Sequence, residues 1–349
     1  MIDFSKHLIQ TGTSLKLGLK KLNDLSRDAI LFVVDKENKL IGSLTDGDIR
    51  RGLINELSVD STIDDFIQKE PKYIRKSNYT LNEIIQLRKR DLKIVPVIDE
   101  NDIIIKVLNF RLNKSYLPLD AVIMAGGLGS RLKPLTDNKP KPLLDVGGKT
   151  IIEHNIDNLI SYGVDDFYIS IMYLGDQIES HINSTYNTDA SINFIREDKP
   201  LGTIGSVSNI KNFNHDYVLI TNSDILTNLN YEEFFLDFIA KGTDMSILTI
   251  PHKVDIPYAV LETRKNMVKS FKEKPKMTYY CNGGIYLLKT DVLKKIPQNK
   301  FYNATDLIEK ILKSNSKVSS FPLRGYWLDI GNHEDYNKAQ NDIQHLNDL

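Results

Sequence analysis

One stretch near the middle of the chain constrains the fold more than any other. Residues 121–125 form an apolar run that is followed at once by Gly126, Gly127 and Gly129, and then by several Lys and Arg side chains. A buried strand that ends in glycines presents backbone N–H groups to an anion at close range. The cations that follow can neutralise several phosphate charges. The pattern therefore predicts a strand-end cradle for the phosphates of a nucleoside triphosphate.

Two other phosphate-binding loops do not fit this stretch. The P-loop requires Gly, four residues, and then Gly-Lys-Ser/Thr; residues 148–150 supply the ending, but Leu143 stands at the first Gly position. The dinucleotide fingerprint G-x-G-x-x-G begins at Gly127, but Leu132 stands at the third Gly position. A glycine turn after a strand is by itself a weak signal, because many such turns are only structural.

Apolar strands alternate with helical segments from residue 119 onward. The expected strands are 121–125, 166–171, 191–196, 217–221, 245–249 and 284–288, and the expected helices are 151–162, 177–186, 204–209, 231–241 and 304–314. Such alternation predicts an α/β domain with a mostly parallel sheet. Ligands of such sheets bind beyond the carboxyl ends of the strands, which is where the glycine loop falls.

Composition excludes several classes of protein. A length of 349 residues favours about two domains, and a net charge of -1 argues against a sequence-independent nucleic-acid binder. No apolar run reaches the ~18 residues of a membrane span, and the first ten residues lack the apolar core of a signal peptide. The single cysteine, Cys281, leaves no internal disulfide framework and fits a reducing cytoplasm. We expect a cytoplasmic protein with no nucleic-acid or membrane partner.

The first 118 residues repeat one theme twice. The first copy is expected to have a helix at 15–25 and strands at 30–35 and 40–44, and the second a helix at 81–90 and strands at 94–99 and 103–109. Repetition at this spacing predicts two copies of one supersecondary unit packed together. The polar segment 113–118 ends in Pro and is the expected linker to the rest of the chain.

The motif G-S-L-T-D-G-D-I-R-R at residues 42–51 resembles the end of a CBS motif. The resemblance implies a tandem CBS (Bateman) module, with one motif in residues 1–58 and the other in residues 59–115. Modules of this family come in pairs and often bind adenine nucleotides. A homodimer or higher homo-oligomer formed through the module is therefore expected.

Thr45 and Asp48 are the ligand-binding positions that the CBS resemblance implies. They would hydrogen-bond the ribose and phosphate groups of an adenine or guanine nucleotide. The second copy reads K-V-L-N-F at 106–110 and offers neither residue. The alternative is that Thr45 and Asp48 only cap the next helix, which Thr and Asp commonly do, and that the module is a dimerisation platform.

The full run from Gly126 to Pro142 resembles the opening motif of the sugar-1-phosphate nucleotidyltransferases, G-G-x-G-x-R-L-x-P-L-T…P-K-P. Further matches follow in order: L-G-T at 201–203, a strand ending in Asp at 218–224, E-K-P at 273–275, N-x-G-x-Y at 282–286 and W-x-D-I-G at 327–331. The resemblance implies a Rossmann-like, GT-A-like catalytic domain over residues 119–349. It also implies the reaction of a sugar 1-phosphate with an NTP to give an NDP-sugar and pyrophosphate.

The resemblance implies a role for each candidate site residue. The catalytic cations would be Arg131, Lys141 and Lys274; the nucleotide-binding residues Ala125, Gly126, Gly127, Glu197, Gly202 and Thr203; the sugar-binding residues Glu273, Asn282 and Gly284; and the Mg²⁺ ligands Asp224 and Asp329. A sugar phosphate is already ionised near neutral pH, so catalysis is expected to be positioning and charge neutralisation.

One motif departs from the family pattern: residues 257–260 read P-Y-A-V where P-Y-G-V is usual, which puts a backbone contact to the sugar in doubt or narrows that pocket.

Glu197 indicates the base of the nucleotide. Relatives specific for uracil or thymine usually carry Gln here, which both donates and accepts, whereas a carboxylate only accepts. Guanine offers two adjacent donors, so Glu197 favours GTP; the neighbouring Asp198 is the competing candidate.

A CBS pair ahead of this domain also resembles the glucosamine-1-phosphate guanylyltransferases of legionaminic acid synthesis, which favours an amino-sugar or related hexose phosphate. The alternatives are an enzyme that uses UTP, dTTP or CTP, and a nucleotide-sensing regulator with an inactive transferase domain.

Overall fold

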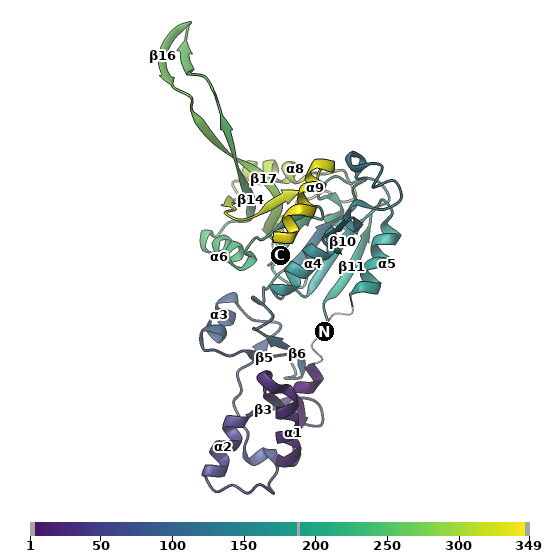
Figure 1. Ribbon diagram of the computed structural model, residues 1–349, viewed down its shortest axis with the longest axis vertical. Helices are drawn as coiled ribbons and strands as arrows, with labels where there is room; N and C mark the ends of the chain where they lie inside the picture. Colours follow the sequence, from purple (N-terminus) through teal and green to yellow (C-terminus); the bar gives the residue numbers. More distant parts are fainter. Residues whose placement is uncertain (1–3, 187–188, 346–349) are drawn as a thin grey trace. The chain divides into compact units, whose positions relative to one another are not determined.

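The computed structural model describes residues 4–186 and 189–345. The chain divides into two compact units, Met1–Pro118 and Leu119–Leu349 (Figure 1). None of the described helices combines the length and the apolar composition that crossing a lipid bilayer requires.

The unit Met1–Pro118 contains two small sheets of the same topology. The first sheet consists of β1 (Leu8–Gln10), β2 (Ile30–Val34) and β3 (Leu40–Thr45), and the second of β4 (Ile74–Arg75), β5 (Ile94–Ile98) and β6 (Ile104–Asn109). The helices are α1 (Leu15–Leu25), α2 (Asp46–Ile54) and α3 (Leu81–Lys89). In each sheet the first two strands are parallel and the last two antiparallel. The strand and helix ends lie within one residue of the expected positions, and the reading of this unit as a tandem repeat stays a prediction.

The two repeats share a hydrophobic core. Phe32 and Val34 of the first sheet pack in one buried cluster with Ile98, Ile104 and Val107 of the second. Burial of these side chains between the two sheets stabilises both.

The unit Leu119–Leu349 is built on a seven-stranded sheet with the order β11-β10-β7-β12-β17-β14-β18. The strands are β7 (Asp120–Met124), β10 (Asp166–Ile171), β11 (Ser191–Arg196), β12 (Tyr217–Asn222), β14 (Met245–Asp255), β17 (Lys276–Lys289) and β18 (Val318–Pro322). The neighbours β11, β10, β7 and β12 are parallel to one another, as is β14 to β18, and β17 is antiparallel to both of its neighbours. The predicted α/β fold with a mostly parallel sheet is confirmed.

Helices and short strands surround this sheet. They are α4 (Ile151–Ser161), α5 (Gly175–Thr185), α6 (Tyr231–Lys241), α7 (Thr290–Leu293), α8 (Ala304–Lys313) and α9 (His333–Asp342), with the two-stranded sheets β8 (Asp145–Val146)–β9 (Lys149–Thr150) and β13 (Ile225–Thr227)–β19 (Trp327–Asp329). Val122, Ile220 and Leu288 from three adjacent strands pack against Leu307 and Ile311 of α8 in one buried cluster. This core fixes the carboxyl ends of β7 and β12, where the predicted site lies.

Some of the sequence predictions need correction. Residues 204–209 do not form an α-helix; Gly205–Asn209 is a short 3-10 helix, because Gly205 and Ser206 are poor α-helix formers. The helix expected at 177–186 begins at Gly175 and ends at Thr185. The strands expected at 245–249 and 284–288 are the inner parts of β14 and β17, which continue well beyond them.

The outer parts of β14 and β17 form an exposed hairpin, here called the arm (residues 251–281). It also contains β15 (Val260–Arg264) and β16 (Met267–Lys272) and projects beyond the other elements of its unit (Figure 1). Lys265 and Asn266 both have positive φ at the tip, as a two-residue type I′ hairpin turn requires. Throughout the arm the side chains are exposed, apart from Ile256 and Pro275, which are half-buried.

Candidate active site

The glycine loop follows β7 directly and opens at the carboxyl end of the sheet. Ala125 is buried, and its N–H donates to Ser170 O of β10 at 2.8 Å, which continues the β7–β10 ladder into the loop. A Cβ atom on Gly126 would lie 3.1 Å from a carboxylate oxygen of Glu197, so Gly126 permits the close approach of that side chain. Gly129 has φ +62, in the left-handed region that favours glycine. The predicted cradle is therefore present as a strand-end turn.

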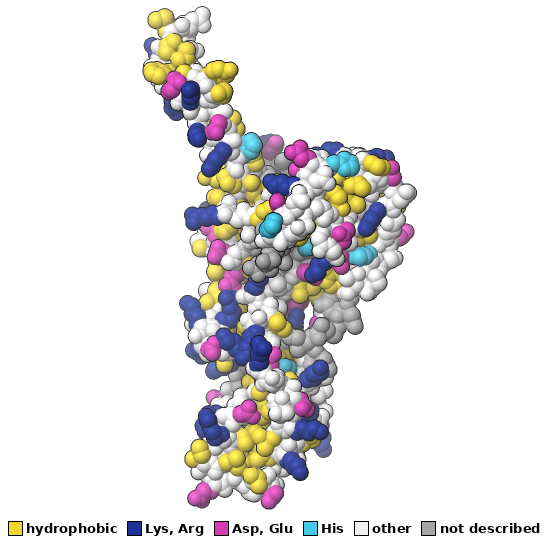
Figure 2. Space-filling view, viewed as in Figure 1, with side chains coloured by type: hydrophobic (Ala, Val, Ile, Leu, Met, Phe, Trp, Pro, Cys, Tyr) yellow, Lys and Arg dark blue, Asp and Glu magenta, His cyan; other side chains and the backbone are white. Residues whose placement is uncertain are grey.

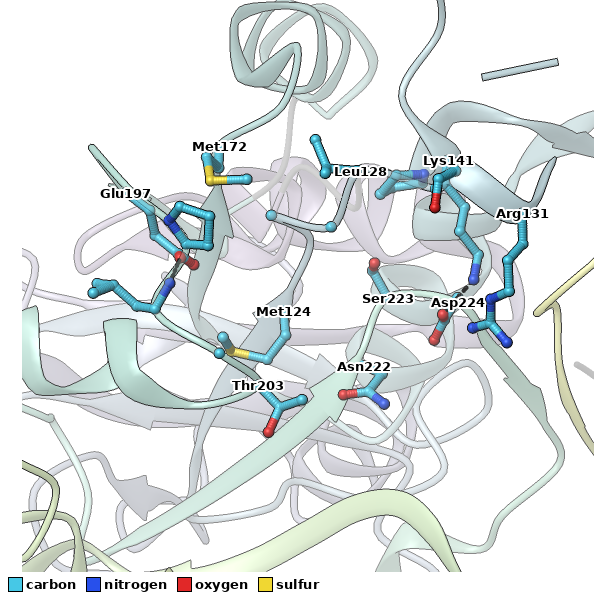
Figure 3. A pocket seen from close by; sticks show the side chains of 18 of the residues that line it. Met124, Leu128, Arg131, Lys141, Met172, Glu197, Thr203, Asn222, Ser223 and Asp224 are labelled. Atoms are coloured by element: carbon cyan, nitrogen blue, oxygen red, sulfur yellow. Dashed lines mark hydrogen bonds and ion pairs between the residues drawn. The ribbon is translucent and has the colours of Figure 1, made fainter. Parts of the chain in front are cut away.

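A cavity of about 430 Å³ lies in front of this loop. Eight of the predicted site residues line it: Gly126, Gly127, Arg131, Lys141, Glu197, Gly202, Thr203 and Asp224. They come from segments up to about a hundred residues apart in sequence, which the sheet brings to one edge. Figure 3 shows Lys141, Arg131 and Asp224 gathered at one end of the cavity and Glu197 and Met172 at the other.

Asp329 is not among the residues that line the cavity, but it lies beside Asp224, which does line it. Asp224 directly precedes β13, Asp329 ends β19, and the two strands are paired. The N–H of Ile330 donates to the carbonyl of Asp224 at 3.0 Å, which ties the two segments together. Burial raises the pKa of the Asp329 carboxyl above its ordinary value, and the neighbouring Asp224 carboxylate raises it further.

Two contacts hold the Asp224 turn in place. The N–H of Ser223 donates to the carbonyl of Met124 on β7 at 3.1 Å, and the buried amide of Asn155 on α4 donates to the carbonyl of Ser223 at 3.3 Å. Because the neighbouring backbone is fixed by a strand and a helix, the Asp224 side chain points into the cavity from a rigid base (Figure 3).

The carboxylates have unused hydrogen-bonding capacity. One oxygen of Asp224 accepts a hydrogen bond from the Lys141 ammonium, whereas Oδ1 of Asp224 and Oδ1 of Asp329 are buried and have no partner within the described part of the chain. Buried acceptors without donors are costly, so these two atoms fit a ligand that supplies positive charge. Hard carboxylate oxygens are ligands that Mg²⁺ prefers. No group of three or more His, Cys, Asp and Glu suited to a metal occurs in residues 4–186 and 189–345.

The other end of the cavity is organised around Glu197. Its Oε1 accepts a hydrogen bond from the Ser170 hydroxyl at 2.6 Å, and its Oε2 accepts one from the N–H of Leu201 at 3.0 Å. The side chain is half-buried and fixed, but each carboxylate oxygen can accept a further hydrogen bond. This end can therefore bind a group that carries adjacent N–H donors.

None of the predicted sugar-side residues lines the cavity. Asn282 lies at the root of the arm, where its side-chain amide oxygen Oδ1 accepts from the N–H of Gly284 at 2.9 Å; Gly284 in turn packs against the cavity residue Asn222. Glu273 and Lys274 lie farther out on the arm, exposed, and are not among the residues that line the cavity. Their predicted contact with substrate stays a prediction.

Comparisons with known proteins agree with this geometry. The profile of the family described as "Nucleotidyl transferase" matches residues 120–345, which is more than half of the chain. The chain belongs to the nucleotidyl transferase family. The matched segment begins one residue after the start of the unit Leu119–Leu349 and contains every candidate site residue except Thr45 and Asp48.

Several relatives of this nucleotidyl transferase carry guanylyltransferase names. A putative mannose-1-phosphate guanyltransferase of Sulfolobus acidocaldarius is 31% identical over 222 residues, which cover 62% of this chain and 61% of the relative. The D-glycero-alpha-D-manno-heptose 1-phosphate guanylyltransferase of Aneurinibacillus thermoaerophilus is 30% identical over 233 residues, covering 65% of this chain and 99% of the relative. The match to the mannose relative thus spans only about six-tenths of its length.

A solved structure has the same fold. The crystal structure of HddC from Yersinia pseudotuberculosis, complexed with GMP-PN, superimposes with a TM-score of 0.50 and 28% sequence identity, covering 64% of this chain and 99% of HddC. The similarity lies at the level of the fold and of the family motifs.

The structure of this nucleotidyl transferase adds residues to the cavity that the sequence did not single out. Met172 directly follows β10, and the rule that ligands lie beyond the carboxyl ends of parallel strands would have found it. Phe301 precedes α8 and also lines the cavity, with 63% of its surface exposed. Its sequence context carries no motif, so only the fold identifies it.

Thr45 and Asp48 form a capping box at the start of α2. Oδ2 of Asp48 accepts from the N–H of Thr45 at 2.9 Å and from its hydroxyl at 2.6 Å, and Oδ1 accepts from Arg51 at 2.5 Å. The capping role that the sequence left open is therefore present. Nucleotide binding by these two residues stays a prediction.

Proposed function

We propose that the chain transfers a guanylyl group from GTP to a sugar 1-phosphate, giving a GDP-sugar and pyrophosphate. The observation that carries the proposal is the polarity of the cavity: Arg131, Lys141 and Asp224 lie at one end, with Asp329 beside Asp224, and Glu197 lies at the other. A triphosphate would suit the first end once a divalent cation binds the two carboxylates, and a guanine base would suit the second by hydrogen bonding. The names of the relatives support the same nucleotide.

The proposed reaction is an in-line displacement at phosphorus. An oxygen of the sugar phosphate forms a bond to the α-phosphorus of GTP, and the bond from that phosphorus to the oxygen bridging to the β-phosphate breaks. Pyrophosphate leaves with the bonding electrons, and no proton transfer is required near neutral pH. Lys141 would stabilise charge on the α-phosphate and Arg131 charge on the leaving pyrophosphate, because each lies at the cationic end of the cavity.

A magnesium ion would be held by Asp224 and Asp329. The buried, unpartnered oxygens of both side chains support this assignment. When bound, the ion would supply the positive charge that lets two polyanions approach each other. The Lys141 ammonium, which now pairs with Asp224, would then be released toward phosphate.

Selection of guanine would rest on Glu197. Its carboxylate is oriented by Ser170 and by the N–H of Leu201, so it can accept from N1–H and N2–H of guanine without reorganisation. Uracil offers one N–H donor beside two carbonyl oxygens, and those oxygens would meet a carboxylate. A site built to accept two hydrogen bonds therefore disfavours uracil.

The sugar is proposed to be a hexose or amino-sugar 1-phosphate, such as glucosamine 1-phosphate. Support comes from the combination of two motifs in one chain, a CBS-like repeat and a guanylyltransferase-like domain. The relatives' names point instead to mannose and to a heptose, so these sugars belong in the same experiment.

The decisive experiment measures pyrophosphate release. The full chain is incubated with Mg²⁺, each of GTP, ATP, UTP, dTTP and CTP, and the 1-phosphates of glucosamine, mannose, glucose and the manno-heptose. We expect release with GTP and one or more of these sugars, and none when either substrate is omitted. Release that is fastest with UTP, dTTP or CTP would support the alternative nucleotide, and release with no combination would contradict the proposed function.

We further propose that Met1–Pro118 is a tandem CBS module that binds an adenine or guanine nucleotide and forms a homodimer. The repeated topology of its two sheets supports the first part. Equilibrium dialysis of the full chain with ATP, AMP and GTP, with Lys141→Ala to weaken the catalytic cavity, tests nucleotide binding. Tight binding there together with no pyrophosphate release would favour a nucleotide sensor over an enzyme.

A further inference from the structure

Two polyanions meet in the proposed reaction, yet the cavity offers few cations. Among the described residues that line it, Arg131 and Lys141 are the cations, and Lys141 is already paired with Asp224. A triphosphate and a sugar phosphate together carry more negative charge than these two side chains and one bound divalent ion can neutralise. The acceptor side of the cavity therefore needs positive charge from another segment.

The arm carries that charge. Residues 251–281 contain seven Lys and Arg against three Asp and Glu, a net charge of +4, whereas the whole chain has a net charge of -1. The rest of the chain is thus net acidic, at -5. Three of the lysines, Lys272, Lys274 and Lys276, occur at alternate positions beside Glu273.

These lysines lie opposite residues 257–260, the other segment of the arm that resembles a sugar-side motif of the family. Val260 pairs with Lys272, and the N–H of Ile256 donates to the carbonyl of Pro275 at 3.2 Å, so residues 257–260 and 273–275 face each other across the ribbon. Lys274 has φ +41, a left-handed conformation that is uncommon outside glycine and concentrates at functional positions. A compact group of basic, acidic and aromatic side chains is therefore assembled on the arm.

The arm holds this group away from its own cavity. The ladder between β14 and β17 runs without interruption from Thr249–Asn282 at the root to Asp255–Lys276. Lys274 lies eight residues beyond Asn282, which at ~3.3 Å per strand residue is a separation of about 26 Å. The paired strands stiffen the ribbon, and no residue of 251–281 lines the cavity.

The surface of the arm needs a partner. Tyr258, Met267, Phe271 and Tyr280 expose 76%, 66%, 65% and 61% of their surfaces. Figure 2 shows apolar and charged side chains, most of them basic, on the visible face of the arm. With ten large apolar side chains exposed on the arm, the apolar area is on the order of 1,000 Å², comparable to the ~800 Å² that each partner buries in a standard interface. An isolated two-stranded ribbon is only marginally stable, so burial of this surface is expected.

We propose that the arm of one copy reaches the cavity of a second copy of this chain and supplies Lys274 to the acceptor phosphate there. The inference rests on the proposed function of the cavity. Charge favours this partner, because a basic arm complements the acidic remainder of a second copy, whereas two arms would repel each other. In a dimer with a two-fold axis, each arm would be buried against the other copy, and each cavity would receive a Lys274 side chain.

Mixed dimers test the proposal through activity. Lys141→Ala disables the cavity but leaves the arm intact, and Lys274→Ala does the reverse; each variant alone is expected to lose pyrophosphate release. Co-expressed with different tags, the two should recover about a quarter of wild-type activity, because half of the dimers are hybrids with one complete site each. The matched control combines Lys141→Ala with Asp224→Ala, where no complete cavity exists and no recovery is expected. Hybrid dimers without recovery, or a monomeric protein, would overturn the proposal.

Crosslinking tests the same geometry without activity. In a Cys281→Ser background, Lys274→Cys is placed in one tagged chain and Leu128→Cys, at the rim of the cavity, in another. Oxidation should give a disulfide between the two differently tagged chains. The matched control, Leu312→Cys, changes a leucine of similar exposure outside the lining residues (59% against 55%) and should give none. The absence of a disulfide between the two tagged chains would overturn the proposal, whereas an inactive wild-type protein that crosslinks between chains would count only against the proposed function.

Discussion

Asp329 pairs with Ile225 across the β13–β19 ladder, and this register sets its carboxylate beside that of Asp224, the residue before Ile225. Residues more than a hundred positions apart thus form one acidic pair beneath the glycine loop. Like charges held this close are unfavourable without a compensating cation. The pair is therefore a feature that function, and not stability, explains.

Asp329→Asn should separate stability from activity. Loss of one buried negative charge relieves repulsion with Asp224, so the thermal midpoint is expected to be unchanged or higher. Pyrophosphate release should fall on the order of 10²–10³-fold, with a higher Mg²⁺ requirement. Mg²⁺ titrations of initial rate, with thermal unfolding of the same samples, check both parts, and a variant that keeps full activity at low Mg²⁺ would contradict the metal assignment.

Lys141→Ala should reduce pyrophosphate release on the order of 10²–10³-fold, because it removes a cation from the phosphate end of the cavity. The matched control is Lys149→Ala. Lys149 also pairs with an aspartate, Asp157 at 2.6 Å, but it does not line the cavity, and its loss should change kcat/KM less than twofold. Equal losses in both variants would indicate a general effect on folding.

Glu197→Gln should change the preferred base. The amide offers a donor as well as an acceptor, so discrimination between GTP and UTP is expected to fall at least about tenfold in kcat/KM. Asp198→Asn is the control, since Asp198 is exposed and is not among the lining residues. If Asp198→Asn shifts the preference and Glu197→Gln does not, the wrong carboxylate has been assigned.

Asp120 should make stability depend on pH. Burial raises the pKa of this carboxyl to about 6, although N–H donors of His215 and Asn214 act in the opposite direction. A raised pKa in the folded state stabilises the fold below the unfolded pKa near 4, and this stabilisation is lost as pH rises through 6. Between pH 8 and pH 5, the wild type should gain about 1.4 kcal/mol in unfolding free energy relative to Asp120→Asn.

Fluorescence of Trp327 provides the measurement for Asp120. It is the single tryptophan of the chain and lies in the unit Leu119–Leu349, so urea unfolding followed by its emission reports on that unit. Wild-type and variant curves that respond identically to pH would show that Asp120 titrates at its ordinary pKa.

Much of the fold follows from local pattern. The strands at 166–171 and 191–196 and the helix at 231–241 have the predicted bounds, because apolar periodicity and capping residues act over a few neighbours. The cradle residues could be predicted for the same reason, since the glycines and the strand are contiguous. The bounds of the strands and helices in the first 118 residues could be predicted in the same way.

Other features depend on contacts between residues far apart in the sequence, which a local pattern does not predict. Periodicity could not bring Asp329 beside Asp224, because the pairing of β13 with β19 joins distant segments; family resemblance alone predicted it. The arm was missed because its alternation of apolar and basic residues gives strands without a buried face. Resemblance placed Lys274 at the substrate, and the structure shows that its own cavity lacks it.

Both ends of the arm leave the sheet at one point, the paired residues Thr249 and Asn282. The segment between them thus leaves the sheet and returns to it at one pair of neighbouring residues. Replacing this segment with the equivalent hairpin of a relative would leave the glycine loop and the carboxylate pair undisturbed. On the proposal that the arm binds the sugar phosphate, recognition of the sugar could diverge independently of recognition of the nucleotide.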